Sequence, residues 1–198
     1  METAETILEF WYGETNVEVL NLDKRPLWFQ KDTEFDKVVK TRFEDIVIRA
    51  GNGELHGWSE EAPASALALV LLLDQFPRNI YRGSGQSFAF DSRALQVATT
   101  MIEKGWDRTV AMAGRFFIYL CYVHSEDRNI QEKALELAEK MIELAPADQQ
   151  DRALSYRESV KKHYVVIERF GRYPHRNALL GRLSSPEELA FLATNPGF

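Results

Sequence analysis

Three short segments of the sequence concentrate the side chains that can carry out chemistry. The first directly follows the apolar run Leu71–Leu73, and the others lie near residues 122–127 and 170–177. Their candidate residues are Asp74, Gln75, Arg78, Asn79 and Arg82 in the first segment, His124, Glu126 and Asp127 in the second, and Arg172, His175, Arg176 and Asn177 in the third. We expect the three segments to meet and form one site.

Arginine is concentrated in two of these segments, although the whole chain is acidic with a net charge of -6. The stretch from Arg169 to Arg182 contains no acid. A guanidinium group offers a planar pair of donors to carboxylate or phosphate, so this pattern favours a pocket for a small anionic ligand or the acidic end of a peptide. In this first hypothesis the anion is bound by Arg78, Arg82, Arg172 and Arg176, which are oriented by Asp74, Glu126 and Asp127.

The same arginines also have a purely structural interpretation. They can tie loops to helix ends by pairing with Asp74, Asp91, Glu126 and Asp127. The two interpretations are compatible, because an arginine held by one carboxylate still has donors left for an anion.

The histidines allow a second hypothesis, in which the protein is an enzyme. His124 or His175 would act as general base beside Glu126, because imidazole changes its protonation state near neutral pH. A metal site is a weaker alternative, since the spacing of these residues matches no helical metal-binding motif. We therefore expect no metal and no cofactor. Cys121 lies in an apolar segment and is expected to be an inert core thiol.

Length and composition indicate one ordinary globular domain. The chain has 198 residues, and we predict a single domain over residues 1–198. Its single cysteine excludes an internal disulfide and fits a reducing compartment. The acidic balance argues against nucleic-acid binding, and the longest apolar run, Ala66–Leu73, is far shorter than the roughly 20 residues of a membrane span. Without an apolar signal region at the N-terminus, a cytoplasmic location is expected; no oligomeric state is indicated.

Hydrophobic periodicity and helix start and stop signals predict helices along the whole chain. The expected helices are Thr3–Tyr12, Asp32 or Thr33 to about Gly51, Ala64–Phe76 ended by Pro77, Ser87 or Asp91 to about Lys104, Gly114–Val123, Ser125 to about Ala145, Asp148–Phe170 and Ser185 to about Thr194, with loops at Thr15–Pro26 and Gly57–Ser59. The apolar segment 114–123 has the residue types of a strand, but no second strand is evident to pair with it. Seven or eight helices with short connections predict an all-α domain of antiparallel helix pairs.

The chain resembles a bacterial family known as domain of unknown function 924. The resemblance rests on the motifs Ile7–Glu14, Trp28–Asp32 with Phe35-Asp36, Leu71–Asn79 with Arg82-Gly83, His124–Asp127 with Gln131, and Arg169–Asn177 with Gly181. It implies a tetratricopeptide-like helical fold, and hence a third hypothesis in which the protein is a scaffold for partner proteins. The family has no settled biochemical function, so the resemblance implies no reaction.

Overall fold

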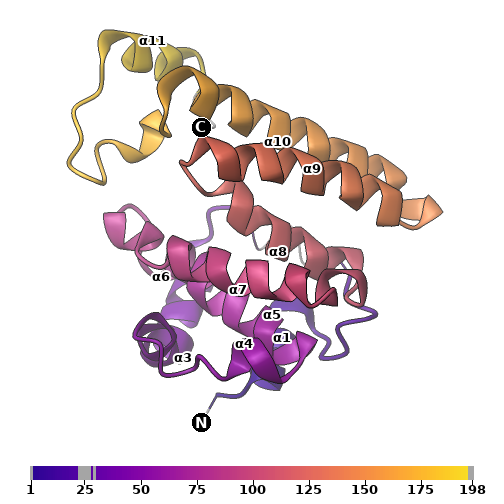
Figure 1. The fold of residues 1–198 in the computed structure, drawn as a ribbon. Helices are drawn as coiled ribbons and strands as arrows, with labels where there is room; N and C mark the ends of the chain where they lie inside the picture. The colour runs from indigo at the N-terminus through magenta and orange to yellow at the C-terminus, as the bar shows by residue number, and fades with distance from the viewer. Residues whose placement is uncertain (1, 22–27, 29, 196–198) are drawn as a thin grey trace. The chain divides into compact units, whose positions relative to one another are not determined.

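The computed structural model describes residues 2–21, 28 and 30–195, and no strand occurs among them (Figure 1). The helices are α1 (Ala4–Tyr12), α3 (Thr33–Gly51), α4 (Trp58–Glu61), α5 (Pro63–Val70), α6 (Phe76–Ile80), α7 (Asp91–Glu103), α8 (Met112–Val123), α9 (Arg128–Leu144), α10 (Gln150–Phe170) and α11 (Pro186–Thr194). The all-α prediction is confirmed, and the predicted number of helices is close. The predicted helix at Gly114–Val123 is also confirmed, as α8.

The helix ends follow local sequence signals. Thr3 accepts a hydrogen bond from the Thr6 N–H in a capping box at the start of α1, and Asp32 accepts bonds from two N–H groups of α3. Gly171 ends α10 in the left-handed conformation, with φ of 66°. Ser185 forms a second capping box at α11. These signals act within four residues, so the sequence is sufficient to predict them.

The prediction that Pro77 ends the central helix is wrong. A π-helical turn, Leu71–Gln75, joins α5 to α6, and the helix runs on to Ile80. The Phe76 N–H bonds to the Leu71 carbonyl, five residues back, so the backbone widens before the proline. Pro77 then lies in the first turn of α6, a position at which proline is tolerated.

Two smaller predictions also differ from the structure. Asp127, not Ser125, caps α9 by accepting a bond from the Ile130 N–H. Ser125 instead accepts a bond from the Asp127 N–H, which shapes the turn before the helix. The expected loop at Gly57–Ser59 contains the start of the short helix α4. Part of the predicted loop Thr15–Pro26, residues 22–26, lies outside the described residues.

The chain divides into two compact units that interleave in sequence. The first unit comprises Met1–Arg82 and Ser87–Cys121, and the second comprises Gly83–Gln86 and Tyr122–Phe198. The last boundary falls inside α8, between Cys121 and Tyr122. The predicted single domain remains a prediction.

The core of the first unit is built from aromatic rings. Trp11 stacks on Trp28, with ring centroids 5.7 Å apart. Phe76 at the start of α6 lies 5.2 Å from the Trp11 ring and 4.9 Å from that of Phe43 on α3. Every residue from 65 to 77 is buried. The polar residues that follow the apolar run are therefore held inside the unit by apolar packing on both sides.

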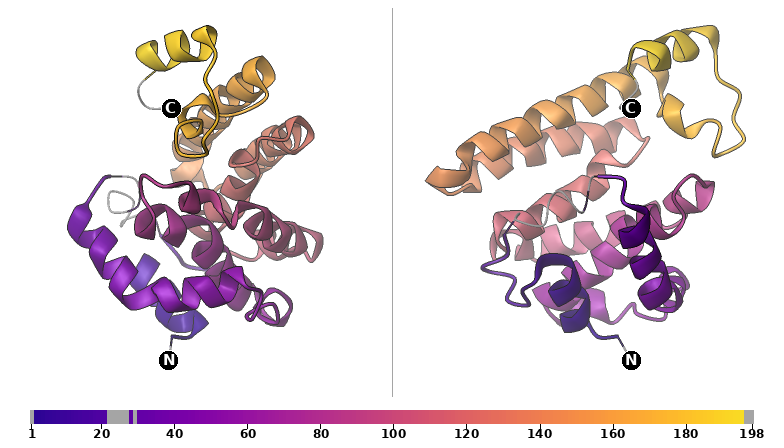
Figure 2. Two further views of the ribbon diagram at one scale, coloured as in Figure 1. Left: turned by 90° about the vertical axis from the view of Figure 1, so that its left-hand side faces the viewer. Right: turned by 180° about the vertical axis from the view of Figure 1, so that it is seen from behind.

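The second unit is built on the helix pair α9 and α10, which run antiparallel side by side (Figures 1 and 2). Val166 and Ile167 on α10 pack with Tyr173 in a small core that Phe170 and Phe191 extend. This pair confirms the antiparallel packing predicted for neighbouring helices. The likeness to tetratricopeptide domains stays a prediction.

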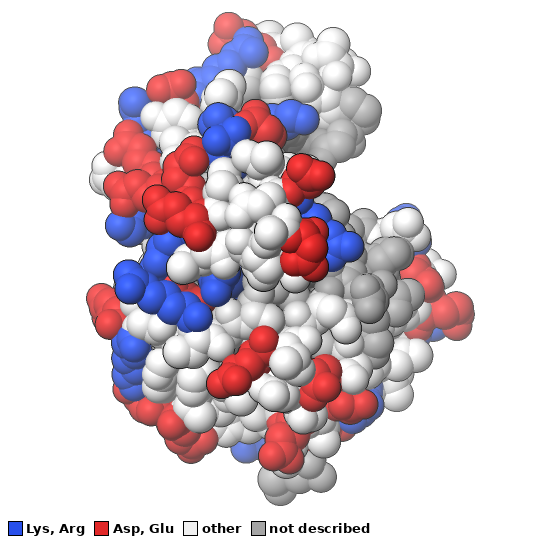
Figure 3. All heavy atoms as spheres, turned by 90° about the vertical axis from the view of Figure 1, so that its right-hand side faces the viewer, with Lys and Arg blue, Asp and Glu red and all other residues white. Residues whose placement is uncertain are grey.

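The surface carries charges of both signs. On the face drawn in Figure 3, acidic and basic side chains are interspersed with uncharged areas. Within the described ranges, no helix is both long enough and apolar enough to cross a membrane.

Candidate functional site

The first segment forms a closed ion-pair cluster at the π-helical turn of the first unit. Asp74 is fully buried, and it accepts a hydrogen bond from the neighbouring Gln75 amide. Arg78 donates two bonds of 3.0 Å to Asp91 and lies 3.3 Å from an oxygen of Asp74. Burial alone would lower the pKa of Arg78, but the charges of Asp74 and Asp91 more than offset it, and the pKa is raised. The guanidinium group therefore stays charged and is held by two carboxylates.

Asn79 and Arg82 converge on Asp36, near the start of α3. Arg82 donates to both oxygens of Asp36, at 2.6 and 2.8 Å, and the Asn79 amide donates at 2.8 Å. Burial would raise the pKa of Asp36, but the bonds from Arg82 and Asn79 lower it overall. These contacts tie α6 to α3, which supports the structural interpretation for this segment. A ligand-binding role for its five candidate residues stays a prediction.

In the second unit, Tyr173 joins the second and third segments. Its side chain is 1% exposed, and its hydroxyl donates to the Val123 carbonyl at 2.5 Å. The hydroxyl also accepts a 2.9 Å bond from the Gln131 amide, and the Tyr173 N–H donates to Glu126 at 2.9 Å. The prediction that these two segments meet is confirmed. Whether the first segment joins them stays a prediction.

Glu126 is held by Arg182. The two side chains form a pair of bonds of 2.6 and 3.0 Å, and Arg182 also donates to the Tyr173 carbonyl at 3.2 Å. Burial would raise the pKa of Glu126, but the bonds from Arg182 and from the Tyr173 N–H lower it overall. Both oxygens are thus engaged, so Glu126 acts as a fixed negative charge.

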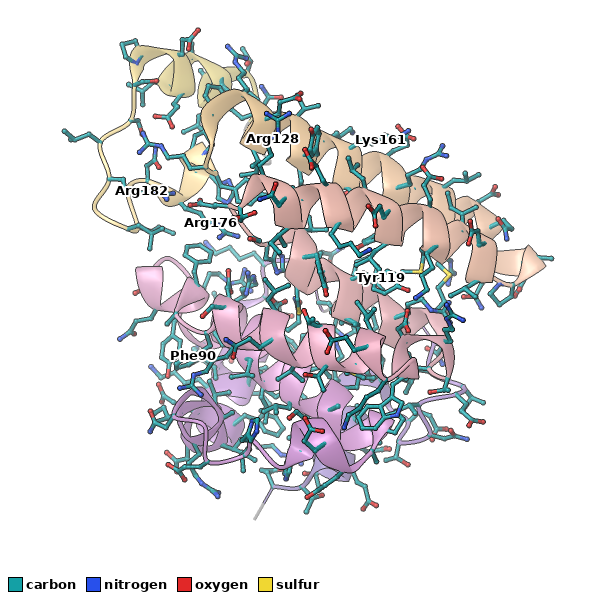
Figure 4. All side chains as sticks on the ribbon, in the orientation of Figure 1. Phe90, Tyr119, Arg128, Lys161, Arg176 and Arg182 are labelled. Carbon is teal, nitrogen blue, oxygen red and sulfur yellow. The ribbon has the colours of Figure 1, made fainter. Side chains whose placement is uncertain are left out.

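Three groups that can carry positive charge surround the Tyr173 ring. The His163 ring lies edge-on, with centroids 5.8 Å apart, and the His175 ring lies 5.5 Å away. The guanidinium of Arg176 lies 4.8 Å from the ring centroid, and Figure 4 shows Arg176 and Arg182 on the segment after α10. His124 follows the Val123 carbonyl that binds the Tyr173 hydroxyl. We call Tyr173 with His124, His163, His175 and Arg176 the Tyr173 cluster.

The groups of the Tyr173 cluster repel one another's positive charge. Burial and the nearby Arg176 lower the pKa of His175 to about 4, and His163 and His124 add to this effect. Burial also lowers the pKa of His163, again with contributions from His124 and Arg176. At neutral pH these two imidazoles are therefore neutral. Nδ1 of His163 lies 2.8 Å from the Ser159 carbonyl and so carries the proton, which makes Nε2 the basic nitrogen.

Comparison with known proteins gives a family. The sequence model of "Bacterial protein of unknown function (DUF924)" matches residues 7–196. The chain belongs to this family. A solved structure of a protein of unknown function from Agrobacterium tumefaciens is similar, with a TM-score of 0.79 and 38% sequence identity over 96% of each chain. The comparison with curated proteins gave no match.

The remaining candidate residues of this DUF924 protein have local partners. Arg172 donates to both oxygens of Glu188, at 2.7 and 2.9 Å, and these bonds lower the pKa of Glu188 to about 2. Asn177 is buried and donates to Ser184 at 3.0 Å. Asp127 is exposed and caps α9, and its predicted role in orienting an arginine stays a prediction.

Sequence reasoning missed three residues of the site in this DUF924 protein, which are Tyr173, Arg182 and His163. Arg182, rather than an arginine of the predicted set, binds Glu126, and 56 residues separate the pair in sequence. His163 follows Lys161 and Lys162 in a charged run, and such a run is typical of a solvent-exposed helix face, so His163 was not recognised as a site residue. Its spacing from apolar residues could have indicated it. His163 lies three residues after Val160 and four before Ile167, and residues at this spacing share one face of a helix, here the buried face of α10.

The described pockets of the first unit lie away from the Tyr173 cluster. One pocket of about 540 Å³ in the first unit is lined by Glu2, Thr3, Ala4, Glu5, Ile46, Arg49, Leu55, Trp58, Glu61 and Ser65. No group of three or more His, Cys, Asp or Glu side chains in the described part of the chain is arranged to hold a metal ion.

Proposed function

We propose that this protein binds a small anion at the Tyr173 cluster. The observation that carries the proposal is the convergence of His163, His175 and Arg176 on one buried ring. At neutral pH Arg176 is the charged group of this set, and protonation of either histidine would place a second positive charge in the same half-buried place, which a bound anion would stabilise. The protein therefore has a physical reason to take up a ligand of negative charge there.

Glu126 does not relieve this repulsion fully. It is the carboxylate that raises the pKa of His175, yet that pKa remains far below its ordinary value. Its two oxygens are held by Arg182 and by the Tyr173 N–H. One negative charge is thus shared among Arg182, Arg176 and the imidazoles, which leaves the surroundings of the cluster net positive once a histidine is protonated.

The four arginines of the first hypothesis fall into two groups according to their described contacts. Arg78, Arg82 and Arg172 are each bound by carboxylates through paired hydrogen bonds. Their described contacts fit a structural role. Arg176 lies within the cluster, so we assign anion binding to Arg176 together with the histidines.

Nuclear magnetic resonance of the histidine side chains tests the proposal. The chain has four histidines, and His56 lies outside the cluster in an exposed position. Titration with sulfate is expected to shift the ring signals of His124, His163 and His175 and leave those of His56 unchanged. Assignments come from single His→Gln variants.

Two outcomes of this titration would contradict anion binding. If all four histidines shift in parallel, sulfate acts only through ionic strength. If none shifts up to millimolar sulfate, the cluster does not bind anions. An Arg176→Gln variant that retains its fold by circular dichroism should lose the response while His56 stays as in the wild type.

Acid–base catalysis by the same cluster is a second candidate. The observation that favours it is the fixed orientation of His163, whose Nδ1–H donates to the Ser159 carbonyl and so presents Nε2 as a base. His124 or His175 could then act as the partner acid or base. A pH–rate profile that changes in His163→Gln but not in His56→Gln would support it, and no turnover across a broad substrate panel would count against it.

A further inference from the structure

We propose that the larger pocket of the first unit binds a small organic cation, an amine that carries an apolar body. The pocket has a volume of about 540 Å³ and is lined by residues from the start of α1, the end of α3, α4 and the start of α5. Pockets that bind small molecules have volumes of this order. The proposal is separate from anion binding at the Tyr173 cluster, since it concerns the other unit and a ligand of the opposite charge.

Apolar side chains line one part of this pocket. Ile46 and Leu55 are buried, and Trp58 is half-buried beside them in the lining. The Ser65 hydroxyl lies 3.0 Å from the carbonyl oxygens of Trp58 and Ala62, and the Trp58 N–H donates to the Leu55 carbonyl at 3.0 Å. The backbone of Trp58 is therefore held in place by contacts within the protein.

The Trp58 ring is available for a contact with a ligand. Trp11 and Trp28 stack on each other in the core, and Nζ of Lys104 lies 4.5 Å from the centroid of the Trp106 ring. Within the described ranges, the Trp58 ring has no stacked ring and no cation of this kind. An indole face attracts a cation more strongly than a phenyl or phenol face does. Trp58 can therefore bind a ligand's positive group as Trp106 binds Lys104.

Two of the charged residues that line the pocket are already paired. Glu2 accepts bonds of 2.9 and 3.2 Å from Arg42. Arg49 donates a 3.0 Å bond from its Nε to Glu54. Arg49 is the one basic residue among the described lining residues, so the pocket offers an anion no positive charge that is not already balanced.

The other two charged residues of the pocket are acids without a partner. Glu5 lies in the first turn of α1 and Glu61 ends α4, and both side chains are exposed. In the part of the chain that the structure describes, neither side chain forms a hydrogen bond or an ion pair. Thr3 caps α1 in a capping box, so the chain's own groups occupy the N-terminus of this helix. The pocket therefore presents negative charge to a ligand.

A cationic amine with an apolar body matches the charge and the apolar lining together. Its ammonium group is attracted by Glu5, Glu61 and the face of Trp58, and its apolar part covers Ile46 and Leu55. A neutral compound of the same shape would gain only the apolar contact. A carboxylate of the same shape would be repelled by the two acids.

Phenethylamine, 2-phenylethanol and phenylacetate form a matched set of probes. Each has a phenyl ring on a short chain, and at pH 7 the chain ends in a cation, a neutral hydroxyl and an anion respectively. Nuclear magnetic resonance of the intact protein follows the indole N–H signals of its four tryptophans during titration with each probe. The Trp58→Phe variant assigns the signal of Trp58.

Phenethylamine is expected to shift the indole signal of Trp58 and to leave those of the stacked pair Trp11 and Trp28 unchanged. Its affinity should exceed that of 2-phenylethanol by about tenfold, because two carboxylates and one indole face act on the charge. Phenylacetate should produce no shift of the Trp58 signal.

Substitution of the acids tests the source of this selectivity. Glu5→Gln and Glu61→Gln should each weaken phenethylamine binding by about two- to fivefold and leave 2-phenylethanol binding unchanged. Glu9→Gln is the matched control, because Glu9 is an exposed acid of α1 that does not line the pocket. It should bind phenethylamine as the wild type does.

Three outcomes would overturn the proposal. Equal affinity for phenethylamine and 2-phenylethanol would mean that the pocket does not recognise charge. Equal effects of Glu9→Gln and Glu61→Gln would mean that the net charge of the protein, and not the pocket, attracts the amine. An unchanged Trp58 signal at millimolar phenethylamine would show that the amine does not bind in this pocket. None of these results alters the sulfate titration of the Tyr173 cluster, so the two proposals fail independently.

Discussion

At the scale of single residues, Tyr173 links several side chains of the second unit. Its hydroxyl bonds to Val123 and Gln131, its N–H bonds to Glu126, and its ring contacts His163, His175 and Arg176. Because the ring is buried, water neither screens these contacts nor competes for their hydrogen bonds. Tyr173 is therefore both a core residue and the platform on which the histidines are placed.

Removal of the Tyr173 hydroxyl should destabilise the protein. Tyr173→Phe keeps the ring but removes the bonds to Val123 and Gln131, and we expect a loss of about 1 to 2 kcal/mol in the free energy of unfolding. Urea denaturation measures this loss. Tyr164→Phe is the control, because Tyr164 lies on the neighbouring helix α10 and bonds only weakly, at 3.3 to 3.5 Å. Equal effects of the two substitutions would contradict the assignment.

His175 should make stability fall at acid pH. Its pKa is about 4 in the folded protein against 6.5 ordinarily, so below pH 6.5 the unfolded chain binds the proton more tightly. The stability contribution of neutral His175 is complete above pH 6.5 and is lost as pH falls toward about 4. Between pH 7 and 4 the wild type should lose of the order of 2 kcal/mol more than His175→Gln. Denaturation at several pH values measures the difference, and a His56→Gln variant should follow the wild type; parallel curves for His175→Gln would refute the effect.

At the scale of elements, the π-helical turn Leu71–Gln75 explains how polar groups come to lie in the first unit's core. The wider turn lets the chain pass Pro77 without ending the helix, and it buries Asp74 and Gln75. The Asp74 carboxylate then faces Arg78 one turn later. A buried carboxylate is tolerated here because a charged partner and an amide donor satisfy it.

Neutralising Asp74 tests this account. Asp74→Asn keeps the volume of the side chain but removes one of the two charges that hold Arg78, and we expect a loss of about 2 to 4 kcal/mol in the free energy of unfolding. The exposed Asp45→Asn on α3 should change stability by less than about 0.5 kcal/mol. Thermal and urea denaturation measure both. A neutral effect at Asp74 would mean that Asp91 alone satisfies Arg78.

At the scale of the whole molecule, the two compact units are not separable segments of sequence. The chain crosses from one unit to the other after Arg82, after Gln86 and after Cys121. The last crossing occurs within α8, so the hydrogen bonds of one helix belong to both units. Loss of structure in one unit therefore removes part of a helix that the other unit uses.

We expect the protein to unfold in one cooperative transition. Asp74→Asn in the first unit and Tyr173→Phe in the second should each move the same calorimetric transition, with equal calorimetric and van't Hoff enthalpies. Differential scanning calorimetry measures this. Two transitions, each sensitive to only one of the substitutions, would contradict the prediction of a single domain.

The sequence by itself determined the helical class and most helix ends. The caps at Thr3, Asp32 and Ser185 and the terminal Gly171 act through hydrogen bonds or backbone preferences within a few residues, so they are visible in the sequence. Polar groups beside apolar runs are conspicuous, so the sequence also indicated the charged and histidine candidates of the second and third segments, but it did not indicate Tyr173 or His163.

Only the tertiary structure decided which charges meet. Arg82 binds Asp36 from 46 residues away and Arg182 binds Glu126 from 56, and no local pattern encodes such pairs. His163 joined the site for the same reason, since its place on the buried face of α10 matters only once that face packs against Tyr173. The continuation of the helix past Pro77 depended on a π-helical turn whose polar groups are buried and satisfied by contacts distant in sequence, including that of Arg78 with Asp91.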